Sequence, residues 1–202
     1  VIQDASYRSI LKGTNLRKCF ELVDGVRKDG CELPIVFMMY YNTVLHYGLE
    51  AFAEKCAEVG VDGLIIPDLP LEEQQPLKDA LAKQNATILI QLVAPVSDKR
   101  IPEILKDARG FVYCVSSLGV TGMRSQITTD VGAMVELVKK SSDIPAAIGF
   151  GISGPEQAKK MATVSDGVIV GSAIVKLVEK YGKDAVPYVA EFVKSVKDAI
   201  RE

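Results

Sequence analysis

Six short runs of apolar and β-branched residues, separated by amphipathic helical patterns, constrain the fold of this chain more than any other feature. The runs are apolar almost throughout and do not alternate, which is typical of parallel strands buried under helices on both faces. Along the sequence, successive runs begin about as far apart as one strand and one helix require. They cover residues 34–40, 61–67, 86–93, 110–116, 145–150 and 166–170.

The segments between these runs have the spacing of helices. In residues 49–57, for example, apolar side chains recur at positions i, i+3, i+4, i+7 and i+8 until Gly60 ends the pattern. Thr14 is the expected N-cap of a helix near Leu16, and Ser153 is the expected capping residue of one near Pro155. No linker or low-complexity stretch interrupts the alternation, so we expect one α/β domain over residues 1–202.

Composition excludes several classes of protein. The chain has 24 Lys and Arg against 26 Asp and Glu, a formal net charge of -2, which disfavours a nucleic-acid binder that neutralises phosphates. No apolar run reaches the roughly 18 to 20 residues of a membrane span, and residues 1–11 lack the apolar stretch of a secretory signal. We therefore expect a cytoplasmic protein that binds no membrane.

The cysteines and the histidine give no sign of a metal site. Cys19, Cys31, Cys56 and Cys114 lack metal-type pairing, and we expect them to be reduced and mostly buried. His46 is the only histidine, which nearly excludes a His-based triad or a multi-His metal centre. Its position just before a helix favours a surface or capping role.

Glycine-rich turns follow the last two runs, where ligands of parallel α/β proteins bind. Residues 149–154 have the spacing G-x-G-x-x-G after a strand, which can indicate a dinucleotide site. That site needs an acidic residue at the end of the next strand, whereas Asp166 begins it. Two successive turns of this kind, at Gly151 and Gly171, instead favour backbone amides that bind a phosphate. Glycines that serve only to make tight turns are the alternative.

Other strand ends allow more than one interpretation. Residues 116–130 form a long loop of Gly, Ser and Thr, which is either an active-site lid or only a mobile connection. Asp68 could be an acid or a base, but a structural or partner-facing use is at least as plausible. Tyr113 lies inside a strand, where it either lines a pocket or fills the core.

Taken together, the loops resemble those of the tryptophan synthase α-subunit family. The match follows the family's order and spacing from Ile2 to the C-terminus, and Gly-Val-Thr-Gly together with Gly-Phe-Gly-Ile-Ser is its most specific part. The matching motifs occupy residues 39–42, 61–63, 67–70, 119–122, 149–153 and 171–175. The resemblance implies a TIM (β/α)8 barrel lyase that splits indole-3-glycerol phosphate into indole and glyceraldehyde 3-phosphate, without metal or organic cofactor.

The resemblance also implies roles for individual residues. The substrate phosphate would be bound by Gly122, Gly151, Gly171 and Ser172, and Thr121 would lie on a closing lid. Tyr40, Tyr113 and Phe150 would line the pocket, and Met38, Ile65 and Leu92 match positions that enclose the indole. Asn42, Asp68 and Pro70 match the surface that contacts the β subunit of a heterotetramer.

An intact barrel has eight βα units, and about six are counted here, matching strands three to eight of the family. The resemblance implies that the two proton-transfer carboxylates of the family, a Glu and an Asp, lie upstream of Val1, so no catalytic residue is assigned. Asp4 is not given that role merely because it is near. Two further hypotheses remain open: a catalytically incomplete binding or allosteric partner of a β subunit, and another phosphate-sugar barrel enzyme.

Overall fold

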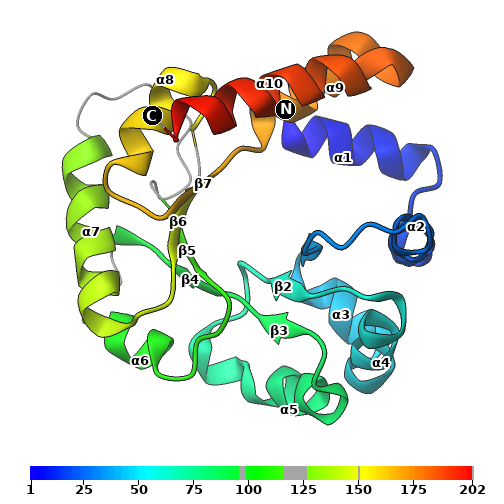
Figure 1. Cartoon of the computed structure of the whole chain (residues 1–202). Coiled ribbons are helices and arrows are strands. Elements are labelled where there is room, and N and C mark those ends of the chain that lie inside the picture. Colours follow the sequence, from blue (N-terminus) through cyan, green and yellow to red (C-terminus); the bar gives the residue numbers. More distant parts are fainter. Residues whose placement is uncertain (96–98, 116–126, 150, 202) are drawn as a thin grey trace. The chain divides into compact units, whose positions relative to one another are not determined.

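A computed structural model describes residues 1–95, 99–115, 127–149 and 151–201, with only the backbone for residues 127–130 (Figure 1). The alternation of helices and parallel strands is as predicted. The strands are β1 (Val36–Met38), β2 (Gly63–Ile65), β3 (Ile88–Leu89), β4 (Gln91–Val93), β5 (Val112–Val115), β6 (Ala146–Gly149) and β7 (Gly167–Ile169). The helices are α1 (Ile2–Leu11), α2 (Leu16–Lys28), α3 (Tyr41–Tyr47), α4 (Leu49–Val59), α5 (Gln75–Gln84), α6 (Ile101–Leu105), α7 (Ile127–Ser141), α8 (Pro155–Ala162), α9 (Ser172–Tyr181) and α10 (Ala185–Ala199), with short 3-10 helices η1 (Leu71–Glu73) and η3 (Gly182–Asp184).

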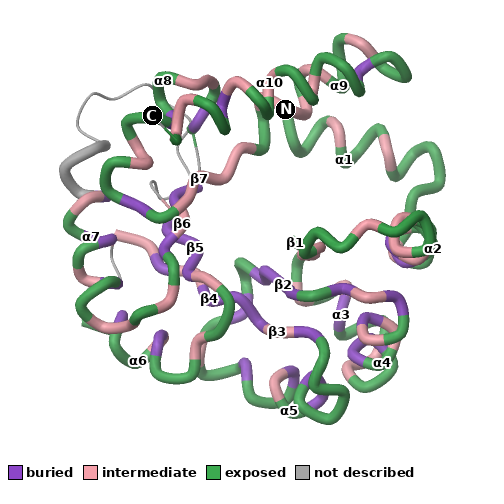
Figure 2. The backbone as a smooth tube through the Cα atoms, viewed as in Figure 1, coloured by how far each residue is buried: buried purple, intermediate pink, exposed green. Residues whose placement is uncertain are grey.

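All six predicted strands are confirmed, and one of them is divided. The run at 86–93 forms β3, which pairs with β2, and β4, which belongs to a second sheet with the order β4-β5-β6-β7. Burial on both faces holds for β2, whose three residues are all buried (Figure 2). It was wrong for β1, where Met38 is 59% exposed, and for β7, whose residues are only half-buried.

Two predicted helix caps differ from the structure in detail. Asn15, not Thr14, is the N-cap of α2, because its backbone is extended and its Oδ1 accepts the Lys18 N–H at 3.1 Å. Gly154 is the N-cap of α8, which begins at Pro155 as predicted. The Ser153 hydroxyl instead donates to Gln157 Oε1 at 2.9 Å.

The chain divides into two compact units, which we describe separately. The N-terminal unit consists of Ile10–Leu92 and Ala108–Gly110, and the C-terminal unit of Val1–Ser9, Val93–Asp107 and Phe111–Glu202. The interpretation of residues 1–202 as one domain stays a prediction.

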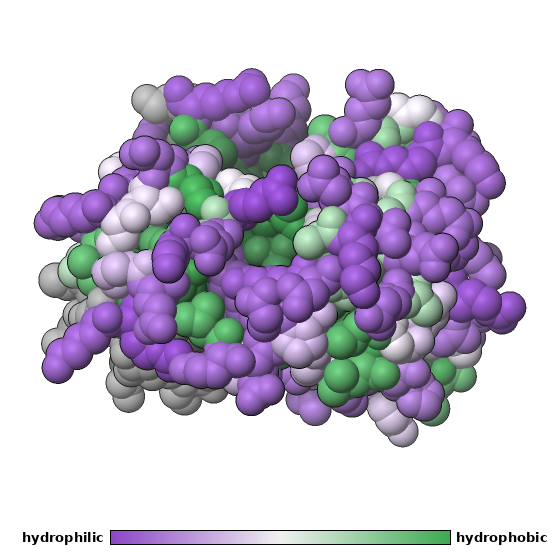
Figure 3. All heavy atoms as spheres, turned by 90° about the horizontal axis from the view of Figure 1, so that it is seen from below, coloured by the Kyte–Doolittle hydropathy of each residue, from purple (hydrophilic) through white to green (hydrophobic). Residues whose placement is uncertain are grey.

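The core of the N-terminal unit lies between the sheet β1-β2-β3 and helices α2, α4 and α5. Phe20 and Phe52 are buried at its centre with ring centroids 5.7 Å apart, and Phe37 and Tyr47 pack against Phe20. Tilted and edge-on ring pairs of this kind add to the stability that area burial alone provides. The face of the molecule seen in Figure 3 is largely hydrophilic.

In the C-terminal unit, one face of the sheet β5-β6-β7 packs under helices. Val112, Cys114, Ala146 and Ile148 point to this face and are fully buried. Burial raises the pKa of the Cys114 thiol to about 12, so it remains an inert apolar group at neutral pH. The four cysteines are all free, and Cys56 is buried like Cys114, whereas Cys19 and Cys31 are only half-buried.

The same aspartate device fixes strand register in both units, at the two repeated sequence phrases 59–66 and 164–170. Asp62 donates its N–H to the Ile35 carbonyl at 2.8 Å, and its Oδ2 accepts the Ile35 N–H at 2.7 Å. Asp166 makes the same pair of bonds to Ala146, both at 2.9 Å. Each carboxylate also binds a cation from the helix that precedes the neighbouring strand: Arg27 for Asp62 and Lys139 for Asp166.

Within the described residues, no helix is long and apolar enough to cross a membrane.

We predict that Asp166 makes the stability of the protein depend on pH in the acid range. The Ala146 N–H, followed by the Lys139 ammonium, lowers the pKa of this carboxyl below its ordinary value. A carboxyl with a lowered pKa stabilises the fold above its unfolded-state pKa, near 3.9, and this contribution is lost as the pH falls through the folded-state value. Urea midpoints measured between about pH 6 and pH 3 should therefore fall less steeply for Asp166→Asn than for the parent.

Asp143→Asn, at an exposed carboxylate of the same unit, is the matched control and should keep the parent slope. Parallel acid limbs for the parent and Asp166→Asn would show that the hydrogen bonds of Asp166 do not favour its charged form.

Candidate functional site

The candidate site lies at the carboxyl ends of β5, β6 and β7. The strands are parallel and in register, with Val115 opposite Gly149 and Gly149 opposite Ile169. Gly151 and Gly171 each follow two residues beyond the pair Gly149 and Ile169. Because neighbouring strands lie about 4.8 Å apart, this register places the two turns side by side at one edge of the sheet.

The turn after β6 needs glycine for its conformation. Gly151 has φ +81°, in the left-handed region that side chains rarely adopt, and it is exposed. The next residue, Ile152, is buried and packs with Ala158 of α8 and Val196 of α10. The left-handed turn thus exposes the backbone at Gly151 while Ile152 anchors the loop in the core.

The turn after β7 leads directly into α9. Gly171 is the N-cap of this helix and Ser172 is its first residue, and both are exposed. The first N–H groups of a helix have no partner within the helix and carry its positive dipole end. With the Ser172 hydroxyl, this turn offers donors suited to an anion.

Tyr113 of β5 lies across the end of β6. It is 8% exposed, and a Cβ on Gly149 would lie within 2.6 Å of Tyr113 Cε1 and still nearer its Cζ and Oη. The ring therefore occupies the space that any other side chain at Gly149 would fill. Burial raises the pKa of the Tyr113 hydroxyl, which stays protonated at neutral pH.

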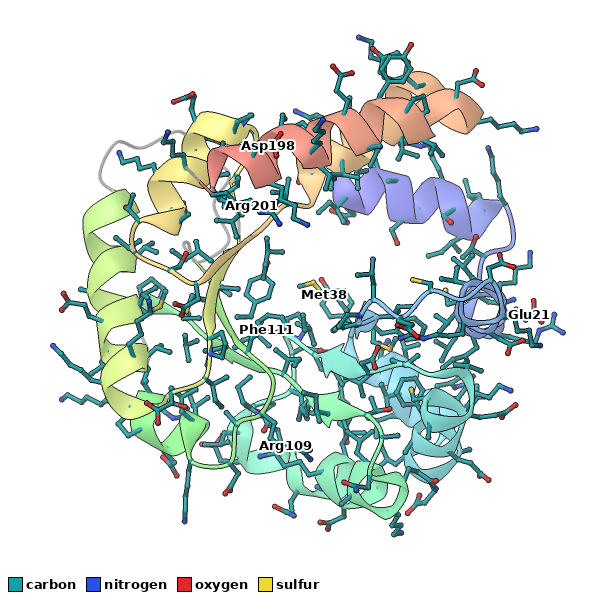
Figure 4. The ribbon with its side chains drawn as sticks, in the orientation of Figure 1. Glu21, Met38, Arg109, Phe111, Asp198 and Arg201 are labelled. Carbon is teal, nitrogen blue, oxygen red and sulfur yellow. The ribbon has the colours of Figure 1, made fainter. Side chains whose placement is uncertain are left out.

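The remaining predicted substrate residues fall into two groups. Thr121, Gly122 and Phe150 lie outside the described residues, as does the predicted lid except for its last four residues, which open α7 instead of continuing the loop. Tyr40 belongs to the N-terminal unit and is 68% exposed just after β1. Met38 is in the same unit, and its side chain lies on the side of β1 away from α3 and α4 (Figure 4).

The residues predicted to meet a partner come together within the N-terminal unit. Asn42, Asp68 and Pro70 are all exposed. Asp68 Oδ1 and Oδ2 accept the Tyr41 N–H at 2.9 and 3.2 Å, so the loop after β2 is bonded to the first residue of α3. This contact places Asn42 beside the loop that carries Asp68, and it gives Asp68 a structural use. His46, in the last turn of α3, is exposed as predicted.

Sequence reasoning missed two features of these loops. One is the contact of Tyr113 with Gly149, although a glycine at a strand end beside an aromatic strand residue was an available signal. The other is a buried pair, Gln74 and Gln91, behind the loop of Asp68. Among the described residues, no three His, Cys, Asp or Glu side chains are grouped to hold a metal ion, and a reaction without metal or organic cofactor stays a prediction.

Parallel strands that alternate with helices define an α/β protein. A family model described as tryptophan synthase alpha chain matches residues 1–201. The chain therefore belongs to the tryptophan synthase alpha chain family, which also confirms the TIM-barrel fold expected from its resemblance.

Relatives and solved structures agree with this membership. The tryptophan synthase alpha chain of Lachnospira eligens is 51% identical over 200 residues, covering 97% of this chain and 76% of that protein. The tryptophan synthase α subunit from Campylobacter jejuni is 32% identical with a TM-score of 0.86, covering 97% of this chain and 77% of that one. A structure of the tryptophan synthase a2b2 complex from Pyrococcus furiosus gives 31% identity and a TM-score of 0.87, covering 98% of this chain and 79% of that one.

We predict that Gly149→Ala will disturb the candidate site, because its Cβ would overlap the Tyr113 ring. Overpacking of this kind typically costs about 1 to 3 kcal/mol. The urea midpoint should fall. In a chain that already carries Tyr113→Ala, the same Gly149→Ala substitution should lower the midpoint much less. Gly132→Ala, in α7 with no heavy atom within 4 Å of the new Cβ, is the control and should stabilise by about 0.5 to 1 kcal/mol. Additive losses in the double variant would contradict the contact.

Proposed function

We propose that this chain acts as the α subunit of tryptophan synthase, a lyase that cleaves indole-3-glycerol phosphate into indole and glyceraldehyde 3-phosphate. Membership of the tryptophan synthase alpha chain family over residues 1–201 is the observation that carries the proposal. The chain works in the cytoplasm, in keeping with its composition and its family.

The phosphate of the substrate binds at the two glycine turns. Exposed backbone at Gly151 and Gly171, the first N–H groups of α9 and the Ser172 hydroxyl supply neutral donors next to the positive end of a helix dipole. Gly122, which lies outside the described residues, is assigned to the same phosphate, and Thr121 to the lid. Tyr113 lines the remainder of the substrate pocket in the C-terminal unit.

Cleavage of the substrate breaks the bond between indole C3 and the glycerol chain. C3 gains a proton, the adjacent glycerol hydroxyl loses one to become the aldehyde, and a carboxylate facing N1 assists by taking and returning the ring proton. General acid and base groups contribute about 10² to 10⁴ each to such a rate. Asp68 is the only carboxylate directly after a predicted strand, and its oxygens accept the Tyr41 N–H. We therefore assign it to the partner surface and not to acid or base catalysis.

The partner is a tryptophan synthase β subunit, as in the a2b2 complex from Pyrococcus furiosus. The exposed surface of Asn42, Asp68 and Pro70 contacts it. The alternative hypothesis is that the chain is not catalytic and only binds and stimulates the β subunit. Separate assays of indole release and of β-subunit stimulation distinguish it from the lyase.

We predict that Ser172→Ala will weaken phosphate binding about tenfold or more, because a hydrogen bond to a charged group contributes about 1.5 to 3 kcal/mol. Binding of inorganic phosphate and of glyceraldehyde 3-phosphate is measured by titration calorimetry. Ser195→Ala is the matched control, since the Ser195 hydroxyl donates to Phe192 O within α10. Equal affinities of all three proteins would place the phosphate elsewhere.

We also predict that the polypeptide of 202 residues releases indole at least about 10²-fold more slowly than an α subunit with both proton-transfer carboxylates, because no carboxylate of this sequence is assigned as the acid or the base. The measurement is indole formation from indole-3-glycerol phosphate, with and without β subunit. Turnover near that of an intact α subunit would place the proton-transfer groups within this sequence.

A further inference from the structure

Two glutamines form a closed amide pair inside the N-terminal unit. Gln74 Nε2 donates to Gln91 Oε1 at 3.1 Å, and Gln91 Nε2 donates back to Gln74 Oε1 at 3.0 Å. The two residues are only 7% and 2% exposed. Seventeen residues separate them along the chain, so the pair connects two parts of the fold that are distant in sequence.

The first partner fixes the loop that follows β2. Gln74 lies between η1 and α5, and its Nε2 also reaches the Leu69 carbonyl, at 3.4 Å. Leu69 is buried, while Asp68 and Pro70 on either side of it are exposed. The amide of Gln74 thus holds the inner side of a short segment whose outer side carries the proposed partner contacts.

The same segment is connected to α3. The Asp68 carboxylate accepts the N–H of Tyr41, the residue before Asn42. Gln91, at the other end of the connection, begins β4 and precedes Leu92, which matches a position that encloses the indole in the family. A continuous set of contacts therefore runs from Gln91 through Gln74 and the loop of Asp68 to α3.

A buried hydrogen-bonded pair is not the most stabilising way to fill this space. Replacing both members of a buried hydrogen-bonded pair by apolar groups of the same shape is often nearly neutral in stability, whereas removing one leaves the other unsatisfied. The amide pair instead fixes the orientation of the two side chains, because two antiparallel hydrogen bonds form in only one relative orientation. Because the pair lies directly behind the loop of Asp68 and Pro70, the orientation that it fixes is that of the loop.

We propose that the Gln74–Gln91 pair is a positioning device that sets the loop of Asp68 and Pro70 for binding the β subunit. This inference rests on the proposed function, which supplies the partner. Neither glutamine touches the partner, since both are buried, and each acts through the loop backbone.

The test is the affinity of the whole chain for the β subunit, compared among the parent, Gln74→Met, Gln91→Met and the double variant. Methionine keeps the length and approximate volume of glutamine but removes both hydrogen bonds. Each single variant should bind the β subunit about tenfold more weakly, and the double variant should bind no more weakly than either single variant, because one loss already breaks the pair.

A stability control separates positioning from simple loss of stability. Thr87→Val removes another buried hydrogen bond of the same unit, from Thr87 Oγ1 to the Val61 carbonyl at 2.7 Å, at the amino end of β3. Its thermal midpoint should fall while its affinity for the β subunit stays at the parent value. If a methionine variant does not fold, Gln74→Glu provides the same comparison, because a protonated carboxyl restores the reciprocal pair at low pH and a carboxylate does not.

Parent-like affinity in folded Gln74→Met and Gln91→Met, or in Gln74→Glu at a pH where its carboxyl is ionised, would overturn the positioning role and leave the proposed function intact. A parent chain that does not bind the β subunit at all would instead overturn the proposed partner surface, and the positioning role with it.

Discussion

The hydrogen bonds of Asp62 and Asp166 are the constraint on which the rest of the structure depends. Each aspartate bonds through both its N–H and its carboxylate to the single residue opposite it on the neighbouring strand. A parallel pair that slipped by one residue would turn every side chain to the other face of the sheet. Asp166 therefore holds β7 in register with β6, with Ile148 buried and the turns at Gly151 and Gly171 at one edge of the sheet.

The contacts that stabilise the fold and the backbone that could bind a ligand lie at opposite ends of the strands. The amino ends carry the ionic contacts, and Arg27 alone donates to the carbonyls of Gly60, Cys31 and Leu33 as well as to Asp62. The carboxyl ends of β6 and β7 are followed by exposed backbone at Gly151 and Gly171. Because the tight contacts lie at the opposite ends, the loops of the candidate site can vary without loss of register.

Much of this organisation could be predicted from the sequence. Apolar runs at regular spacing predict parallel strands because burial on both faces leaves little room for polar residues, and all six runs proved to be strands. The two glycine turns could be found for the same reason, since ligands meet parallel strands at their carboxyl ends. Thr14 failed as a cap because Thr and Asn both suit that position, and only the structure shows that the side chain of Asn15 accepts the Lys18 N–H.

The features that the sequence concealed are those that join residues distant along the chain. Nothing near Gln74 indicates that its amide will meet that of Gln91, and the glycine at the end of β6 signals a close neighbour without showing that it is the Tyr113 ring. Local patterns report which face of an element is apolar, whereas such contacts depend on register and on the depth of each loop. The contact of Tyr113 with Gly149 depends on the β5–β6 register, so it becomes visible only once these strands are aligned. The loop of Asp68 is then explained by its contacts with Gln74 and Tyr41, and its exposed residues form the proposed partner surface.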